Sequence, residues 1–387
     1  MPEKSPFDET DSSQPTVKGR SQATVTGLLV SGDSGADFIG EASRMNATVL
    51  EDKFFGRGLE IQFNQKVGES TESALREVVK YHAIRNPEAN HAQLIEIGFG
   101  EQYSSKDGPS AAVACALLVE SILTGKELDS TFAVTGDMNA DGTVQAVGGI
   151  DGKIRGATKG GAGIVAIPNA NSATLSDLAI LGETTYFINI QIFSIATFED
   201  ALELARTESD RSPAVRDSLA AFGEVQKVLR RPDGAKWIVN PHVISRLEEV
   251  VRLTPNHESA RHLLLMGRKQ TSPQLSLAGS FLQIYRSVKP MRSALNEGVI
   301  PEDTRGLSES IFTLRRVRSL LDPRTRGCAD ALEDFAETIK KIGDTDFGTA
   351  QSRVPRLVEE LNETWIRVVD EYEKIQSDAQ IQEELML

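Results

Sequence analysis

The stretch from Ser110 to Leu123 is almost entirely apolar, and read as a helix it is apolar on every side. Such a helix cannot lie at a protein surface, so other elements must surround it. Pro109 suits the first turn of this helix, and Gly125 suits its C-terminal cap. The sequence therefore predicts a domain built around one buried central helix.

The composition is that of a globular protein, with 40% hydrophobic and 25% charged residues. The net charge of −14 argues against binding to nucleic acid or to an anionic membrane, because both repel an acidic surface. No apolar window approaches the length of about 18 residues that suggests a membrane span, and the polar N-terminus does not resemble a signal peptide. We therefore expect a cytoplasmic protein in which Cys115 and Cys328 are free thiols.

Strand and helix patterns mix along the chain as far as about residue 205. Residues 1–21 lack apolar periodicity and are expected to form a disordered tail. Strands are expected at 23–30, 58–63, 92–97, 131–135, 143–147, 164–168 and 186–193, and helices at 70–84, 110–123, 197–206 and around Lys153. The strands 131–135 and 143–147 flank Asp141-Gly142 and are expected to pair through that turn.

The sequence beyond residue 205 carries no convincing strand pattern. Residues 205–235 include an Arg-Arg-Pro-Asp-Gly segment and are predicted to be a linker. Residues 236–387 carry apolar stripes at heptad-like spacing that prolines interrupt, which predicts an all-α helical bundle rather than one long coiled coil. Residues 241–267 resemble a tetratricopeptide hairpin, but a repeat array needs about three units, so an ordinary helical hairpin is favoured.

Ser110 and Lys153 are the candidate catalytic pair. A serine hydroxyl is a poor nucleophile at neutral pH and needs a base, which a lysine supplies when burial lowers its pKa. Lys153 has apolar neighbours and nearby glycines that permit close backbone approach. Thr135 can accept a hydrogen bond from the amine, and the first turn of the Ser110 helix offers free N–H groups for an oxyanion hole. Asp107 leaves three roles open: it can hold the loop, pair with the lysine or cap the helix.

Four segments carry a family resemblance. Residues 106–111 (Lys-Asp-Gly-Pro-Ser-Ala), 135–137, 147–153 and 160–168 resemble, in this order, the blocks of the Lon protease proteolytic domain. The 43-residue gap between Ser110 and Lys153 also fits that family.

The resemblance covers residues 22–204 and implies an α+β fold of the Lon type, with a mixed β-sheet and helices around the buried central helix. It also implies serine endopeptidase chemistry, with Ser110 as nucleophile, Lys153 as general base and Thr135 in support; Asp107 completes the candidate site. Ala112 and Asp137 depart from the family, which usually has glycine and glutamate there.

No Gly-x-x-x-x-Gly-Lys-Ser/Thr phosphate loop occurs in the sequence. We therefore expect no ATP hydrolysis by this chain and no cofactor. The substrates are then expected to be unfolded or flexible proteins, or proteins that a separate unfoldase or adaptor delivers. The resemblance also suggests a homo-oligomer, because Lon-type domains commonly assemble in rings.

Two alternatives stay open. Residues 108–112 nearly match the Gly-x-Ser-x-Gly elbow of α/β-hydrolases, with His242, His257 and His262 as conceivable bases. A polar loop separates Ser110 from the preceding strand, however, and these histidines are expected to be solvated, while His82 and His91 are expected to be structural. The second alternative is an inactive Lon-like scaffold whose helical C-terminal domain mediates protein interactions; retention of the serine, lysine and threonine disfavours it.

Overall fold

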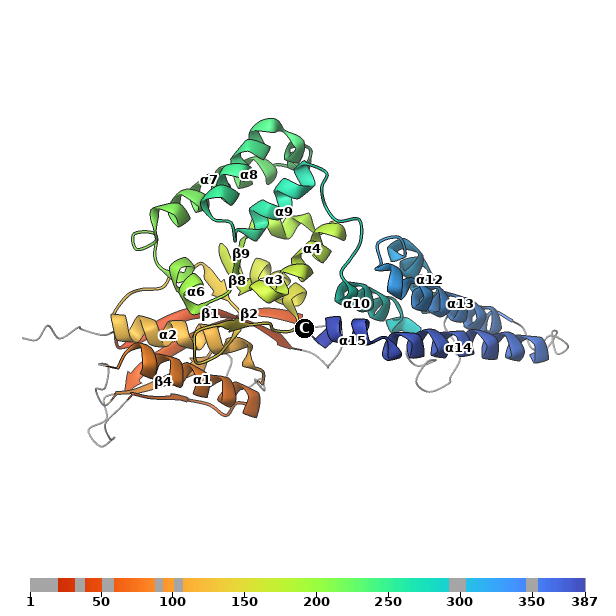
Figure 1. Ribbon diagram of the computed structural model, residues 1–387, viewed down its shortest axis with the longest axis horizontal. Helices are drawn as coiled ribbons and strands as arrows, with labels where there is room; N and C mark the ends of the chain where they lie inside the picture. The colour runs from red at the N-terminus through yellow and green to blue at the C-terminus, as the bar shows by residue number, and fades with distance from the viewer. Residues whose placement is uncertain are drawn as a thin grey trace, which may run out of the picture.

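The computed structural model describes residues 20–31, 39–50, 59–87, 93–100, 107–291, 304–345 and 354–386. The expected tail lies almost wholly outside the described residues, as does His91. In Figure 1 the sheet and its helices form one body, and the helices of the C-terminal part project from its side. Among the described residues, no helix combines the length and the hydropathy that crossing a membrane requires.

A seven-stranded mixed sheet organises the body, in the order β3-β4-β2-β1-β5-β8-β9. The pairs β1–β2 and β2–β4 are antiparallel, whereas β3–β4, β1–β5, β5–β8 and β8–β9 are parallel. The strands are β1 (Gln22–Ser31), β2 (Ile39–Leu50), β3 (Leu59–Phe63), β4 (Gln93–Phe99), β5 (Phe132–Val134), β8 (Ile164–Pro168) and β9 (Gln191–Ile195). Sequence reasoning missed β2, because its buried face carries Ser43, Met45 and Ala47 and gives little apolar contrast.

Helices cover both faces of this sheet (Figure 1). One face packs against α1 (Glu69–Arg85), α2 (Ala112–Thr124) and α6 (Phe198–Ala205). The other packs against α3 (Ile150–Lys159), α4 (Ser172–Ile180) and α5 (Thr184–Asn189). Every residue of α2 from Ala112 to Ile122 is buried, as expected of the predicted central helix.

One predicted strand pairing is wrong, and one predicted strand is wrong in part. The partner of β7 (Val144–Gln145) is β6 (Asp137–Met138), not residues 131–135, which instead form β5 inside the main sheet. Residues 184–189 form the helix α5, so only the end of the predicted strand 186–193 belongs to β9. A short apolar run such as this one does not separate a buried helix from a strand by periodicity alone.

The predicted linker 205–235 is wrong, because most of it is the helix α7 (Pro213–Leu229). Ser212 caps this helix by accepting a hydrogen bond from Val215 N, and Phe222 and Val225 are buried in the core on the second face of the sheet. Sequence reasoning missed α7 although Phe222, Val225 and Leu229 recur at the three- and four-residue spacing that is typical of an amphipathic helix.

Two further helices, α8 (Pro241–Leu253) and α9 (Glu258–Gly267), form a hairpin that joins the same core. The turn between them closes the β9 edge of the sheet. Asn256 O accepts a hydrogen bond from Ser194 N at 3.0 Å, and Ser259 Oγ bonds Ile192 N at 2.9 Å and Ile190 O at 2.8 Å. The body therefore continues as far as α9.

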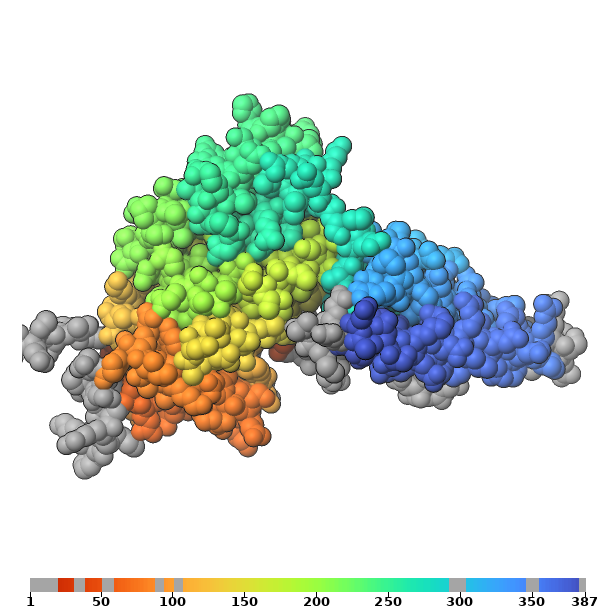
Figure 2. Space-filling model, viewed as in Figure 1, coloured from red at the N-terminus to blue at the C-terminus, as the bar shows by residue number. Residues whose placement is uncertain are grey.

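The described residues beyond α9 form helices around a separate apolar core. They are α10 (Leu277–Ser287), α12 (Arg305–Val317), α13 (Arg326–Gly343), α14 (Val354–Ser377) and α15 (Ala379–Met386), with short 3₁₀ turns between them. We call residues 275–386 the helical region. Figure 2 shows it as a projection that meets the body near α10.

Candidate active site

Lys153 lies on α3 and is one of the largest fully buried side chains of the protein, with 1% of its surface exposed. Its Nζ donates a hydrogen bond to Thr135 Oγ1 at 3.0 Å. Burial lowers the pKa of Lys153 from 10.5 to about 8, because a low-dielectric environment disfavours the ammonium form. An amine with this pKa is partly neutral near neutral pH and can accept a proton, as predicted from its apolar surroundings.

Ser110 lies in a short 3₁₀ turn, Pro109–Ala111, that leads directly into α2. Gly108 precedes this turn with φ of +134°, a conformation that only glycine adopts without strain. Thr71 of α1 holds the turn, because its Oγ1 donates to Gly108 O and accepts from Gly108 N, both at 3.1 Å. The position of the serine is thus fixed by α1 and by the start of the buried helix.

Thr135 connects the lysine to the serine backbone. Its Oγ1 accepts from Lys153 Nζ and donates to Ser110 O at 3.3 Å, and Gly136 N donates to the same carbonyl at 3.0 Å. Both Ser110 and Lys153 are described residues, and no hydrogen bond joins Ser110 Oγ to Lys153 Nζ. The structure therefore brings together the three predicted residues; the hydrogen bond between nucleophile and base is often loose without substrate.

Asp107 is exposed and belongs to the loop in front of Ser110. Its Oδ1 accepts a hydrogen bond from Ser70 N at 3.1 Å, at the first turn of α1. Of the three roles left open, this contact corresponds to holding the loop. Within the part of the chain that the structure describes, Asp107 forms no ion pair with Lys153 and does not cap α2.

Close glycine contacts hold α3 against the sheet. A Cβ atom added to Gly40 of β2 would lie 1.7 Å from Gly152 O, and one added to Gly156 would lie 2.4 Å from Gly40 C. The backbones of β2 and α3 therefore touch directly beside Lys153. Sequence reasoning missed Gly40 because it missed β2, although the i, i+4 spacing of Gly152 and Gly156 is a signal of close helix packing.

Asn171 is a second supporting residue that sequence reasoning missed. Its side-chain amide bonds both backbone groups of Val147: Val147 N donates to Oδ1 and Nδ2 donates to Val147 O, each at 3.0 Å. Val147 begins the loop that leads into α3. This pair of bonds fixes the approach to the helix that carries the lysine.

The histidines of the α/β-hydrolase alternative pack inside the protein or lie at its surface. His257 and His262 are 0% and 4% exposed, so the expectation that they are solvated is wrong; only His242 is exposed. His257 packs between Phe193 and Phe222 with its ring tilted against both, and burial lowers its pKa to about 3 and that of His262 to about 4. Because both side chains are buried and their lowered pKa keeps them neutral, His257 and His262 are packing residues where α9 joins the core of the body.

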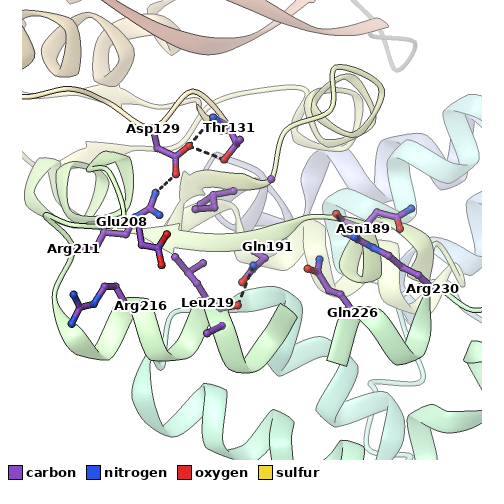
Figure 3. Close-up of a pocket in the computed structure, with 13 residues that line it drawn as sticks. Asp129, Thr131, Asn189, Gln191, Glu208, Arg211, Arg216, Leu219, Gln226 and Arg230 are labelled. Carbon is purple, nitrogen blue, oxygen red and sulfur yellow. Dashed lines mark hydrogen bonds and ion pairs between the residues drawn. The ribbon is translucent and has the colours of Figure 1, made fainter. Parts of the chain in front are cut away.

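A surface cavity of about 450 Å³ lies beside α7 (Figure 3). Thr131 and Gly163, which line it, directly precede β5 and β8, whereas Thr135 follows β5 at the other end of the parallel strands. Figure 3 shows the ion pair of Arg211 with Asp129 at its edge, 2.6 Å long. The cavity is therefore separate from the lysine site and marks where α7 docks.

Residues 18–206 match the family model of the Lon protease (S16) C-terminal proteolytic domain. Over 217 residues the chain is 28% identical to an archaeal Lon protease from Thermoplasma volcanium, which covers 55% of this chain and 32% of that protein. Over 199 residues it is 30% identical to Lon protease 1 from Herpetosiphon aurantiacus, which covers 49% of this chain and 22% of that protein. The chain thus spans less than a third of the length of these relatives. Residues 18–206 belong to the family of Lon protease proteolytic domains.

Proposed function

We propose that this protein is a serine endopeptidase that hydrolyses peptide bonds of unfolded or flexible proteins, with Ser110 as nucleophile and Lys153 as general base. The observation that carries the proposal is the fully buried Lys153 amine, whose pKa is lowered to about 8 and which reaches Ser110 through Thr135. A buried lysine without a carboxylate partner costs stability, and proton transfer is a function that accounts for this cost.

In the proposed mechanism the neutral amine of Lys153 takes the proton of Ser110 Oγ as this oxygen attacks the scissile carbonyl carbon. The C–N bond then breaks, and the ammonium returns the proton to the leaving amine. A water molecule, activated by the same lysine, hydrolyses the acyl-serine ester. Backbone N–H groups of the turn that leads into α2 are the proposed donors to the oxyanion, because they lie at the positive end of the helix dipole. The N–H groups of Ala112 and Val113 already bond Pro109 O and Gly136 O.

We also propose that a separate unfoldase or adaptor delivers folded substrates, and that the protein works as a homo-oligomer. The first part of this proposal rests on the lack of a phosphate-loop motif in the sequence. The second rests on the family resemblance alone.

The alternative function is a scaffold whose helical region binds other proteins. One observation favours it: α14 exposes large apolar side chains, with Val358 at 50%, Ile366 at 57% and Tyr372 at 57% exposed. Exposed apolar groups on one helix are typical of interaction surfaces. The two functions are compatible within one chain, and the experiment below separates them.

The test compares casein cleavage by the wild type, Ser110→Ala, Lys153→Met and the matched control Lys159→Met, an exposed lysine on the same helix. We expect the first two variants to lose activity on the order of a thousandfold, and the control to keep it. The wild-type rate should rise as pH rises through about 8, because the base must be neutral. A wild type as inert as the variants would favour the scaffold, and activity retained in Lys153→Met would exclude the dyad.

A further inference from the structure

The helical region contacts the helix that carries Lys153. Arg286 of α10 forms an ion pair with Asp151, which lies in the first turn of α3 two residues before the lysine. Asp151 is 6% exposed, and its Oδ2 also accepts a hydrogen bond from Arg155 Nη1 at 3.1 Å. The carboxylate is thus held between one arginine of its own helix and one of α10.

A second contact anchors the other end of α10 on α4. Asp177 accepts hydrogen bonds from Ser276 N at 2.7 Å and from Ser276 Oγ at 2.6 Å. Gly279 packs so closely here that an added Cβ atom would lie 2.2 Å from Asp177 Oδ2. Because α10 is fixed at both its start and its last turn, the position of Arg286 relative to α3 is defined.

Two contacts from other elements hold α3 in place. This ten-residue helix lies on the β2 backbone at Gly40, while Arg286 holds its first turn from another element. A buried carboxylate that loses a cationic partner is costly, and the chain relieves this cost by moving or by taking up a proton. A shift of the first turn of α3 would move Lys153 relative to Thr135.

We propose that Arg286 is a positioning residue of the peptidase: docking of α10 holds the first turn of α3 through Asp151 and so places the Lys153 amine against Thr135 and Ser110. Peptidase activity then depends on whether the helical region is docked, which makes this contact a regulatory one. This inference rests on the proposed function and adds to it a role for a region that lies outside the matched proteolytic domain.

The charged groups around Asp151 set the expected direction of the effect. Arg155 faces the carboxylate from α3 itself and is shared with Glu183 at 3.0 Å, and Arg286 faces it from α10. Asp177, the other carboxylate of this interface, is occupied by Ser276. Removing Arg286 leaves more negative charge near Lys153, which favours its ammonium form and raises its pKa.

The experiment measures two quantities in the full-length chain: casein turnover, and the pH titration of the Lys153 ¹³Cε resonance, assigned by its loss in Lys153→Met. For Arg286→Ala we expect kcat to fall about tenfold at nearly constant KM, with the Lys153 midpoint shifted upward. Arg286→Lys should recover most of both. The control Arg315→Ala, which removes exposed ion pairs elsewhere in the helical region, should match the wild type.

A double variant tests the route through Asp151. In an Asp151→Asn background, Arg286→Ala should change kcat and the Lys153 midpoint by less than about twofold, because the two changes act on one contact. The full effect in that background, or a wild-type midpoint and kcat in Arg286→Ala, would overturn the proposal. If Arg286→Ala does not fold, Arg286→Gln takes its place with the same expected directions. The titration needs no turnover, so it still tests the positioning if the wild type proves inactive.

Discussion

The body of the protein and the helical region bury different kinds of side chain. The body buries charged groups in its interior, among them Lys153, Asp151 and Glu258. In the described part of the helical region, the buried polar side chains are hydroxyls such as Ser280 and Thr338, and charges pair at the surface. Burying a charged side chain lowers the stability of the folded state far more than leaving it paired at the surface. The body therefore contains destabilising charged groups that its fold alone does not require.

The charged side chains of the helical region form ion pairs at the protein surface. Arg315 bonds Glu333 and Glu337, and Arg318 bonds Asp330, all with side chains that are partly or largely exposed. Pairs of this kind contribute about 0–1 kcal/mol each. The helical region is therefore held by its apolar core, while the body also holds a costly polar site in place.

The first prediction tests where the body ends along the chain, and it has the largest expected effect on stability. A chain that ends at residue 235 lacks α8 and α9, which belong to the core of the body and close the β9 edge. We expect it to unfold or aggregate, because it exposes apolar core and an unpaired strand edge. A chain that ends at residue 271 should stay monodisperse or assembled as the full chain does, with a cooperative thermal transition.

Size-exclusion chromatography and circular dichroism of both truncations check this boundary. Equal stability of the two chains would show that α8 and α9 are dispensable. The body would then end with α7 rather than with α9.

The sequence predicted the elements whose signal is local. The central helix follows from an unbroken apolar run, and the burial of Lys153 follows from its apolar and glycine neighbours. The contact of Gly40 with α3 and that of Arg286 with Asp151 join residues more than a hundred positions apart, so no local pattern contains them. Likewise, β2 has a weak pattern of its own and is fixed by the sheet that it joins.

The second prediction concerns the cost of burying Lys153. Its folded-state pKa of about 8 lies below the ordinary 10.5, so between these values the unfolded chain holds a proton that the folded chain has lost. Stability therefore rises with pH across this window, and the full cost, about 3 kcal/mol, applies below it. We expect Lys153→Met to be more stable than the wild type at pH 7 by up to about that amount.

Urea unfolding at pH 7 and at pH 10 measures this difference. The advantage of Lys153→Met should shrink at the higher pH, because the buried amine is then neutral in the folded protein. The exposed Lys159→Met should change stability by less than about 0.5 kcal/mol at either pH. A destabilised Lys153→Met at both values would mean that packing and the bond to Thr135 outweigh desolvation.

The third prediction tests the backbone contact that supports the site. In Gly40→Ala the new methyl group would overlap Gly152 O, so α3 must shift away from β2 and carry Lys153 with it. We expect a loss of stability of about 2 kcal/mol, as for an overpacked core, together with a larger loss of peptidase activity than this destabilisation explains. The matched control is Gly223→Ala in α7, where an added Cβ atom meets nothing within 4 Å and helix propensity should stabilise the chain. If Gly40→Ala keeps wild-type activity, the geometry of the site tolerates movement of α3, and the argument that the body holds its lysine through close packing on β2 fails.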